Sequence, residues 1–394
     1  MFAVLHAPRK VLIRVFVLLS VLWVAACETG LPAASGGGGQ QINPGAPIPV
    51  AMLVPKGSPV AGEEALARDL ENAARLAVAD LAGVRIDLRV YGTAGSPANA
   101  RQAALQAAAD GARIIVGPLH AESANAVAVA MAPRNVNVLA FSNNSTIAGG
   151  NLFVLGNTFD NVANRMLGYA RRQGRSRVVI VASNNLAGEV GGTAITRAAT
   201  ANGMSVVGRV NYDFSQEGVV QAVPSVTSAV RKGNADTLFL TANTAGALPL
   251  FSQMLPENGL TPDTIQYVGL TRWDTPPQTL ALPGVQGGWF ALPDTARKTR
   301  FEQRFQAAYG NTPHQIAGLA YDGIAAIGAL SKSGGRNALS RAALTQSAGF
   351  QGTGGVFRFL SDGSNQRALA VATIREGKLF VIEPAPQSFG RAGF

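Results

Sequence analysis

Short apolar runs alternate with alanine-rich segments of helical periodicity from residue 48 to residue 269, and this alternation restricts the fold more than any other feature. Strands that alternate with helices form parallel sheets through right-handed crossovers. The first series predicts strands at 48–54, 85–91, 112–116 and 136–141, with helices at 62–81, 97–110 and 122–132. The second predicts helices at 161–173, 188–202, 217–232 and 245–259, with strands at 177–182, 205–210, 236–241 and 265–269. The expected fold is α/β, with two doubly wound parallel-sheet lobes and a central cleft between them.

The residues after the second series do not continue the alternation. They predict helices at 298–309, 314–331 and 340–347, followed by strands at 356–360, 367–375 and 378–382. Glu376-Gly377 suits a tight hairpin turn between the last two strands. Helices followed by strands indicate that the chain returns to pack on both lobes.

The first 26 residues have the composition of a secretory signal peptide. Basic side chains precede an apolar run at 15–24, which is shorter than the roughly 20 residues that a membrane-spanning helix needs. Small residues then lead to Cys27, the only cysteine of the chain. Segment 24–27 resembles the lipobox of bacterial lipoproteins, which implies acylation of Cys27. The alternative is an ordinary secretory leader with a chance cysteine.

Acylation at Cys27 would hold a soluble domain on a membrane of the bacterial envelope, because two or more acyl chains anchor a protein stably. Glu28 stands where an Asp retains some lipoproteins at the inner membrane, so the outer membrane is favoured. Residues 27–46 are rich in Gly, Ser and Pro, and this composition predicts a flexible tether. The globular domain is expected at 47–385.

The chain carries 33 Lys and Arg against 23 Asp and Glu, a formal charge of +10. Loss of the leader with its three basic residues leaves 30 − 23 = +7. A strongly basic chain raises nucleic acid as a partner, but an exported protein seldom meets it. The positive surface therefore suits anionic lipid, cell-wall polymer or an acidic partner, and no nucleic acid.

Residue counts give little support to catalysis. Three His and one Cys exclude a disulfide framework and a Cys-rich zinc module. Only His120 and His314 follow the leader, and the chain has no Gly-x-Ser-x-Gly elbow, His-Glu-x-x-His motif or phosphate-binding glycine loop. We expect a protein without enzymatic activity, cofactor or bound metal.

Polar residues follow several predicted strands, where ligands of open α/β sheets lie. In the first lobe they are His120, Glu122, Ser123, Ser142, Asn143, Asn144 and Ser145. In the second lobe they are Asn184, Asn185, Asn243, Arg272 and Trp273. Arg272 beside Trp273 suits an anionic or planar group through bidentate and stacking contacts. The alternatives are capping of the next helix for the loops and a surface Arg beside a half-buried Trp.

Four segments resemble the type I periplasmic binding proteins, the group that includes leucine/isoleucine/valine-binding proteins. They are 112–119 (ARIIVGPL), 137–142 (NVLAFS), 177–182 (RVVIVA) and 317–324 (AGLAYDGI). The resemblance covers about residues 47–385 and implies two lobes joined by three crossings that form a hinge. Lobe I is expected to hold about 47–156 and 292–335, and lobe II about 157–291 and 336–385.

The resemblance also implies where a branched-chain amino acid would be held. The matching positions here are Ala121, the loop 142–145, Ala187 and Thr271. An ammonium group needs an anion or carbonyls around it, and no carboxylate stands at the expected position. The available substitutes are Glu122, Glu189 and Asp274.

This altered pocket, the lipobox and the tether together resemble the penicillin-binding-protein activator lipoproteins, as do segments 272–274 (RWD) and 287–293 (GGWFALP). The resemblance implies a non-enzymatic envelope lipoprotein that activates or scaffolds peptidoglycan synthases (penicillin-binding proteins). The alternative is a substrate-binding lipoprotein that delivers amino acids or peptides to the permease of an ABC importer.

Overall fold

A computed structural model describes residues 38–333 and 335–390, which belong to one compact unit beginning at Gly38. The predicted leader, the predicted lipidation site Cys27 and the first part of the predicted tether lie outside the described residues. No helix within the described ranges has the length and apolar character needed to cross a membrane.

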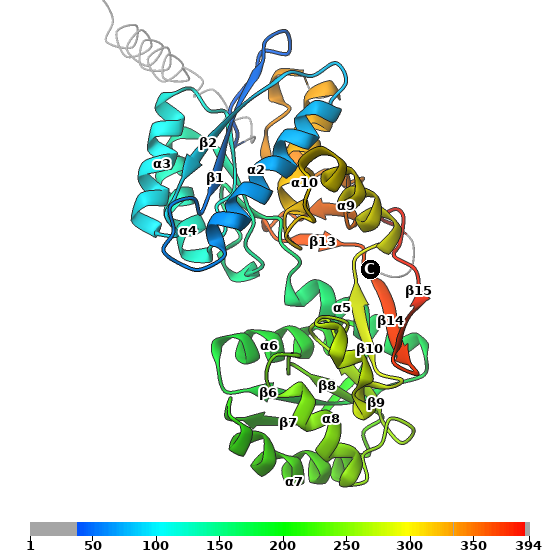
Figure 1. Ribbon diagram of the computed structural model, residues 1–394. Coiled ribbons are helices and arrows are strands. Elements are labelled where there is room, and N and C mark those ends of the chain that lie inside the picture. The colour runs from blue at the N-terminus through cyan, green and yellow to red at the C-terminus, as the bar shows by residue number, and fades with distance from the viewer. Residues whose placement is uncertain (1–37, 334, 391–394) are drawn as a thin grey trace, which may run out of the picture. The chain divides into compact units, whose positions relative to one another are not determined.

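The first sheet is entirely parallel and has the strand order β2-β1-β3-β4-β5. Its strands are β1 (Ile48–Val54), β2 (Ile86–Gly92), β3 (Ile114–Val116), β4 (Asn137–Ala140) and β5 (Leu152–Val154). The connecting helices are α2 (Glu63–Asp80), α3 (Pro97–Ala109) and α4 (Ala121–Met131). Helices α3 and α4 cover one face of the sheet and α2 covers the other (Figure 1).

The second sheet has the order β15-β14-β10-β9-β8-β6-β7. Its parallel strands are β6 (Arg177–Ser183), β7 (Ser205–Tyr212), β8 (Thr237–Leu240), β9 (Gln266–Gly269) and β10 (Trp289–Leu292). Strands β14 (Ala370–Arg375) and β15 (Lys378–Glu383) extend it in antiparallel fashion. Its helices are α5 (Phe159–Arg172), α6 (Leu186–Ala201), α7 (Gln216–Gly233) and α8 (Leu248–Glu257). The predicted fold, two doubly wound α/β lobes, is confirmed.

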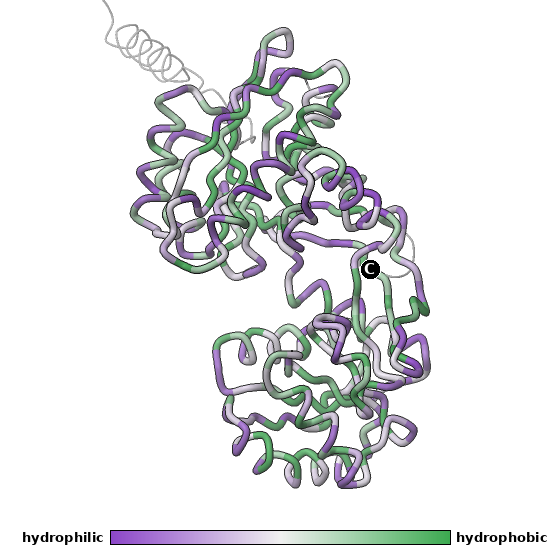
Figure 2. The backbone as a smooth tube through the Cα atoms, viewed as in Figure 1, coloured by the Kyte–Doolittle hydropathy of each residue, from purple (hydrophilic) through white to green (hydrophobic). Residues whose placement is uncertain are grey.

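Both sheets are buried on their two faces. The central strands therefore read as continuous apolar runs, as parallel sheets covered by helices require, and hydropathy along the backbone follows this pattern (Figure 2). Helix α7 places Val219, Val223, Val226 and Val230 on one stripe against the second sheet, which is the spacing of an amphipathic helix.

The C-terminal part of the chain contributes to both lobes. After α9 (Thr295–Tyr309), α10 (Gly318–Ser333) and α11 (Arg341–Leu344) comes a small antiparallel sheet. Its strands are β11 (Phe350–Gly352), β12 (Gly355–Phe359) and β13 (Asn365–Arg367). Short 3-10 turns lie at 132–134, 145–147, 277–281, 283–285 and 335–337.

The small sheet differs from the lobe assignment expected from the sequence. The resemblance implies that residues 336–385 belong to lobe II, but Phe350, Phe357 and Phe359 lie in the first-lobe core, where Phe359 packs edge-on against Phe153. Only β14 and β15 join the second sheet. An apolar strand pattern does not specify which core the strand enters, so the third crossing lies at 368–369 rather than near residue 336.

The end of the predicted tether is also packed rather than free. Ile42 is buried, and its backbone N–H donates to the carbonyl of Arg336 at 2.9 Å. A side chain on Gly39 would put its Cβ 2.3 Å from the carbonyl oxygen of Leu339, so this glycine permits close approach. One apolar residue in a polar, glycine-rich segment therefore fixes residues 38–46 on the first lobe.

Three crossings connect the two sheets, at 155–158, 293–294 and 368–369. Asn365 ties the first crossing to the third, because its side-chain amide donates to the carbonyls of Val154 (2.6 Å) and Gly156 (2.8 Å). Its side-chain oxygen accepts from the amide of Asn161 at 2.6 Å. Buried hydrogen bonds of this kind fix the relative path of the connecting strands.

A buried ion pair reinforces this junction. Arg367 donates through Nη1 to the carboxylate of Asp322 at 2.9 Å, and through Nε to the carbonyl of Leu155 at 2.7 Å. The other oxygen of Asp322 accepts from the backbone N–H of Thr353 at 2.7 Å. Asp322 is fully buried on α10, so its charge is balanced almost entirely by Arg367.

Candidate functional site

A cavity of about 270 Å³ lies at the hinge and receives residues from both lobes. The second lobe contributes Phe159, Val162, Leu270, Thr271, Arg272 and Ala291. The first lobe contributes Lys298, Phe301, Glu302, His314, Gln315 and Ile316. Asn157 and Pro293, from two of the crossings, also line it. A cavity that both lobes line is the arrangement in which binding can be coupled to movement about a hinge.

Two cations stand on opposite walls of this hinge cavity, each with a carboxylate. Arg272 binds Asp274 in bidentate fashion, with Nε–Oδ1 at 2.9 Å and Nη2–Oδ2 at 2.5 Å. Lys298 pairs with Glu302 one turn further along α9. The hinge cavity thus presents charged hydrogen-bonding groups beside an apolar wall, with little net charge.

A smaller cavity of about 130 Å³ adjoins the first one and shares residues such as Asn157 and Gln315 with it. Arg367 and Asp322 line it. The Nη2 atom of Arg367 is buried and has no hydrogen-bond partner among the described residues. An unpartnered guanidinium N–H is costly to bury, so this atom is a donor available to an acceptor in the cavity.

Crossing residue Asp294 positions the first-lobe wall, because it caps α9. Its Oδ1 accepts from the backbone N–H of Arg297 at 3.1 Å, and its Oδ2 accepts from the side chain of Gln387 at 2.9 Å. Burial raises the pKa of Asp294, but these hydrogen bonds and the charge of Arg297 outweigh it, and the pKa lies below its ordinary value. The cap is therefore ionised at neutral pH and suits the positive end of the α9 dipole.

A separate pocket of about 490 Å³ lies on the first lobe alone and contains three of the predicted residues, His120, Glu122 and Ser123. Nε2 of His120 lies 2.9 Å from Oε1 of Glu63, at the start of α2. The second oxygen of Glu63 and the hydroxyl of Ser123 are buried without a partner among the described residues. This first-lobe pocket therefore holds a carboxylate that the sequence prediction did not include.

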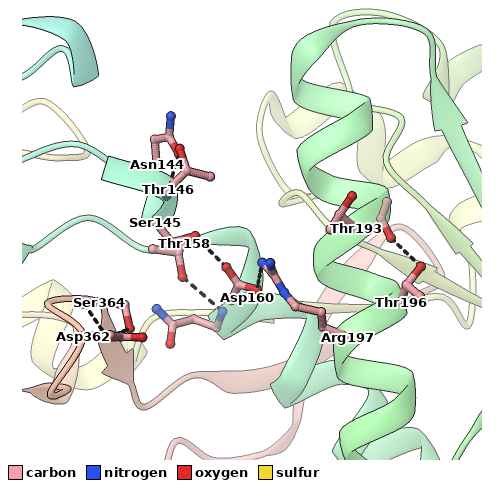
Figure 3. A network of polar contacts seen from close by, with 12 residues as sticks. Asn144, Ser145, Thr146, Thr158, Asp160, Thr193, Thr196, Arg197, Asp362 and Ser364 are labelled. Carbon is pink, nitrogen blue, oxygen red and sulfur yellow. Dashed lines mark hydrogen bonds and ion pairs between the residues drawn. The ribbon is translucent and has the colours of Figure 1, made fainter. Parts of the chain in front are cut away.

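The four predicted residues after β4 serve mainly the chain itself. Ser142 accepts from the backbone N–H of Asn144 at 3.1 Å, and Asn144 caps the following turn. Asn143 is exposed. Ser145 donates to Asp160 of α5 at 2.7 Å, and the other oxygen of Asp160 accepts from Arg197 of α6 at 2.5 Å (Figure 3). Ser145 thereby links the first lobe to the second.

The predicted second-lobe amides also have structural partners. Asn185 caps α6 by accepting from the backbone N–H of Gly188 at 2.8 Å, and Asn184 donates to Asp213 at 2.8 Å. Asn243 is exposed, and its backbone carbonyl accepts from Leu248 at 3.1 Å. None of these three residues lines the hinge cavity.

Trp273 differs most from its expected place. Its side chain is fully buried in the second-lobe core, beside Phe290. Close packing against Gly269 and Gly288 leaves no space for a ligand at the ring. The expected Arg272–Trp273 clamp is therefore not formed, and Arg272 alone reaches the hinge cavity.

The structure thus brings three predicted residues together in the first-lobe pocket and places one, Arg272, in the hinge cavity. The residues that the sequence prediction missed are Glu63, Asn157, Lys298, Glu302, Gln315 and Arg367. A signal existed for Lys298 and Glu302, whose spacing of four suits an ion pair on a helix. Arg367 carried no such signal.

The chain has the architecture of a two-lobed binding protein. Its two doubly wound lobes are joined by three crossings, and both lobes line one cavity. The family model for periplasmic binding proteins matches residues 47–378, and the chain belongs to this family. No curated protein sequence matches the chain.

Solved structures of similar fold come from several bacteria. A Rhodospirillum rubrum protein assigned to branched-chain amino acid ABC transport has a TM-score of 0.72 at 19% identity, covering 86% of this chain and 100% of its own. A Desulfitobacterium hafniense ABC transporter substrate-binding protein in complex with Leu gives 0.62 at 17%, covering 86% and 100%. A solute-binding protein from R. palustris in complex with benzoate gives 0.57 at 17%, covering 89% and 99%. At these identities the likeness shows the fold.

Proposed function

We propose that this protein is the solute-binding component of an ABC importer and that it holds a small organic carboxylate in the hinge cavity. The observation that supports the proposal is the cavity itself, because both lobes line it. Its volume of about 270 Å³ lies near the lower end of the range for ligand pockets. This size suits a molecule of amino-acid or benzoate dimensions better than a peptide.

The side chains around the hinge cavity suit a carboxylate with an apolar body. Nη1 of Arg272 makes no hydrogen bond within the described part of the chain, and Lys298 has N–H groups beyond the one that meets Glu302. Charged donors bind carboxylates strongly. Phe159, Leu270 and Phe301 provide the apolar wall.

Solute binding for an importer is the alternative function that the sequence predicts, and it is better supported than activation of peptidoglycan synthases. Two of the similar structures are described with bound benzoate and Leu, both carboxylates, whereas none of the three is described as a peptidoglycan-synthase activator. In this proposal the protein is not an enzyme, works in the periplasm, and is held at a membrane through Cys27. Its protein partner is then a permease.

Thermal unfolding with single added ligands tests the proposal. Leucine, benzoate, dihydroxybenzoate and a short peptide form the panel. A ligand present at 100 times its Kd stabilises the folded state by about 2.7 kcal/mol, so a small carboxylate is expected to raise the melting temperature clearly. The Arg272→Gln variant is expected to lose most of this shift.

A pair of tryptophan variants serves as a control for the location. Gln315→Trp fills the hinge cavity and is expected to abolish the ligand shift, whereas Gln303→Trp, on the exposed side of α9, leaves it unchanged. The absence of a shift with every ligand, together with retention of a peptidoglycan synthase from detergent-solubilised envelope, would overturn the proposal in favour of the activator reading.

A further inference from the structure

Residues 38–45 lie along the amino end of the first lobe, and five arginines meet this short segment. Gln40 accepts from Nη1 of Arg113 at 2.8 Å and donates to the carbonyl of Arg134. Arg85 donates to the carbonyl of Gly45 at 2.9 Å. The remaining contacts are the Ile42 N–H to the carbonyl of Arg336 (2.9 Å) and the Arg341 N–H to the carbonyl of Gly38 (2.8 Å).

The sheet topology explains why these arginines share one end of the lobe. Arg85 directly precedes β2, Arg113 directly precedes β3, and Arg134 stands shortly before β4. The amino ends of parallel strands lie at the same edge of a sheet. The loops with the predicted ligand residues follow the opposite, carboxyl ends.

Most of the positive charge at this end is not neutralised by the protein. Arg85, Arg113, Arg134 and Arg336 are exposed, and none of them forms an ion pair within the described ranges. The carboxylates nearby have other partners. Asp87 is held by Arg89 at 2.5 Å, and Asp110 accepts from the hydroxyl of Tyr91 at 2.8 Å.

We propose that these four arginines form a face that binds the anionic headgroups of a lipid bilayer. We call it the amino-end face. Guanidinium groups pair with phosphate in bidentate fashion, and each basic residue near an anionic membrane strengthens binding about fivefold. Three of these arginines lie just before the amino ends of β2, β3 and β4, and Arg336 lies in the turn at 335–337 that Ile42 contacts. Their charges are therefore presented at one end of the lobe.

The position of the proposed lipidation site supports a membrane as the occupant. Ten residues, 28–37, separate Cys27 from the packed segment, and ten residues span at most about 35 Å. An anchor at Cys27 therefore keeps the amino-end face close to the lipid surface. This argument rests on the proposed lipidation, but the binding of the face to lipid does not require it.

Docking through this face has a functional consequence. The loops at the carboxyl ends of the first-lobe strands lie at the opposite edge of the sheet, so lipid bound at the amino-end face does not cover them. The acyl anchor and the arginines also act as two signals on one protein, and two signals together give the stable attachment that a single weak one does not.

Vesicle co-sedimentation of the chain from residue 27 with Cys27→Ser, which retains the compact unit and carries no acyl group, tests the proposal. The probes are vesicles of phosphatidylcholine alone and of phosphatidylcholine mixed equally with phosphatidylglycerol. We expect binding to the anionic vesicles only, weakened by salt. Replacing Arg85, Arg113, Arg134 and Arg336 with Gln is expected to lower the affinity by roughly several hundredfold at low salt.

The matched control replaces four exposed basic residues of the second lobe that form no ion pair within the described ranges. They are Arg171, Arg231, Lys232 and Arg375. This variant has the same net charge as the first and is expected to bind nearly as tightly as the parent. An equal loss in both variants would show a net-charge effect and overturn the proposal, as would an amino-end variant that binds like the parent. Because no acyl group or importer ligand is present, neither outcome bears on the proposed transport function.

Discussion

At the residue scale, two glycines of the second lobe pack closely against the ring of Trp273. A Cβ on Gly288 would lie 2.3 Å from the indole ring, and a Cβ on Gly269 would lie 2.4 Å from its nitrogen. The two glycines therefore form the slot that the ring fills. An overfilled core costs about 1–3 kcal/mol, so Gly288→Ala is expected to lower the free energy of unfolding by that amount.

Urea unfolding followed by circular dichroism measures this loss. Gly45→Ala, where a Cβ meets only the side chain of Asn43 at 3.6 Å, is the control and is expected to have little effect. The double variant Gly288→Ala, Trp273→Phe should cost less than the sum of its parts, because the smaller ring vacates the space. Strict additivity would show that the slot is not what fixes Trp273.

The buried Asp322–Arg367 pair gives a second prediction at this scale. Removing one member of a buried ion pair leaves an uncompensated charge and costs about 3–5 kcal/mol. Asp322→Ala is therefore expected to lower the free energy of unfolding by this amount. Asp87→Ala, which breaks an exposed ion pair with Arg89, should lower it by at most about 1 kcal/mol. Similar losses in the two variants, measured by urea unfolding, would contradict the importance of the buried pair.

Individual ligand residues were predictable only in part, for reasons that these positions illustrate. Polarity and placement after a strand selected Arg272, which lines the hinge cavity, but the same signal included Asn144 and Asn185, which cap a turn and a helix. Trp273 looked accessible because the sequence shows neighbours along the chain and not the glycines that enclose the ring. Arg367 lies beyond the second series, and only tertiary contacts bring it to the hinge.

At the scale of elements, Asp80 joins three helices of the first lobe. At the end of α2 it accepts hydrogen bonds from Arg304 of α9 and, at 2.6 Å, from the hydroxyl of Tyr321 of α10. Burial raises the pKa of Asp80, but the two hydrogen bonds and the charge of Arg304 outweigh it, and the pKa lies below its ordinary value. Burial and Asp80 together raise the pKa of Tyr321 to about 12, so its hydroxyl stays a donor at neutral pH.

The free energy of unfolding is expected to depend on pH through Asp80. A carboxyl with a lowered pKa in the folded state contributes stability above its unfolded pKa, and this stability is lost as the pH falls through the folded pKa. Because Asp80 is partly exposed, we expect a contribution of about 1 kcal/mol or less. Asp80→Asn should be less stable than the parent at neutral pH, and the two unfolding curves should converge in acid. Parallel curves from neutral pH to pH 3 would contradict this assignment.

The order of elements was largely predictable, whereas their partners were not. The alternating pattern predicted the strands β1 to β4 and β6 to β9 and the helices between them, because the central strands are buried on both faces and the helices carry apolar stripes. The short strand β5 was not predicted, because three apolar residues are too few to form a recognisable pattern. The small sheet at 350–367 and the packed segment at 38–46 depend on a few residues, such as Phe357 and Ile42, whose partners lie far away in the sequence.

At the scale of the whole molecule, the interleaved chain makes the lobes depend on each other. The first lobe needs the small sheet that precedes the third crossing, and the second lobe needs β14, which follows it. The proposed ligand at the hinge cavity would therefore act on a junction that residues of all three crossings line. The polar contacts of Asn365 hold this junction together.

Removal of the Asn365 side-chain amide tests the role of this junction. Asn365→Ala leaves the carbonyls of Val154 and Gly156 and the side chain of Asn161 without a buried partner. We expect the free energy of unfolding to fall by at least about 2 kcal/mol. We also expect the affinity for the carboxylate found in the ligand panel to fall about fivefold, since a loosened hinge is less preorganised for binding.

Asn151→Ala separates the two effects. Asn151 donates to the carbonyls of Val136 (2.9 Å) and Ala128 (3.1 Å), all within the first lobe. This variant should lose stability in a similar way, but calorimetric titration should give the parent's affinity, because its contacts do not reach a crossing. If both variants bind the carboxylate equally well, the three crossings do not govern the geometry of the cavity, and the binding surface belongs to one lobe alone.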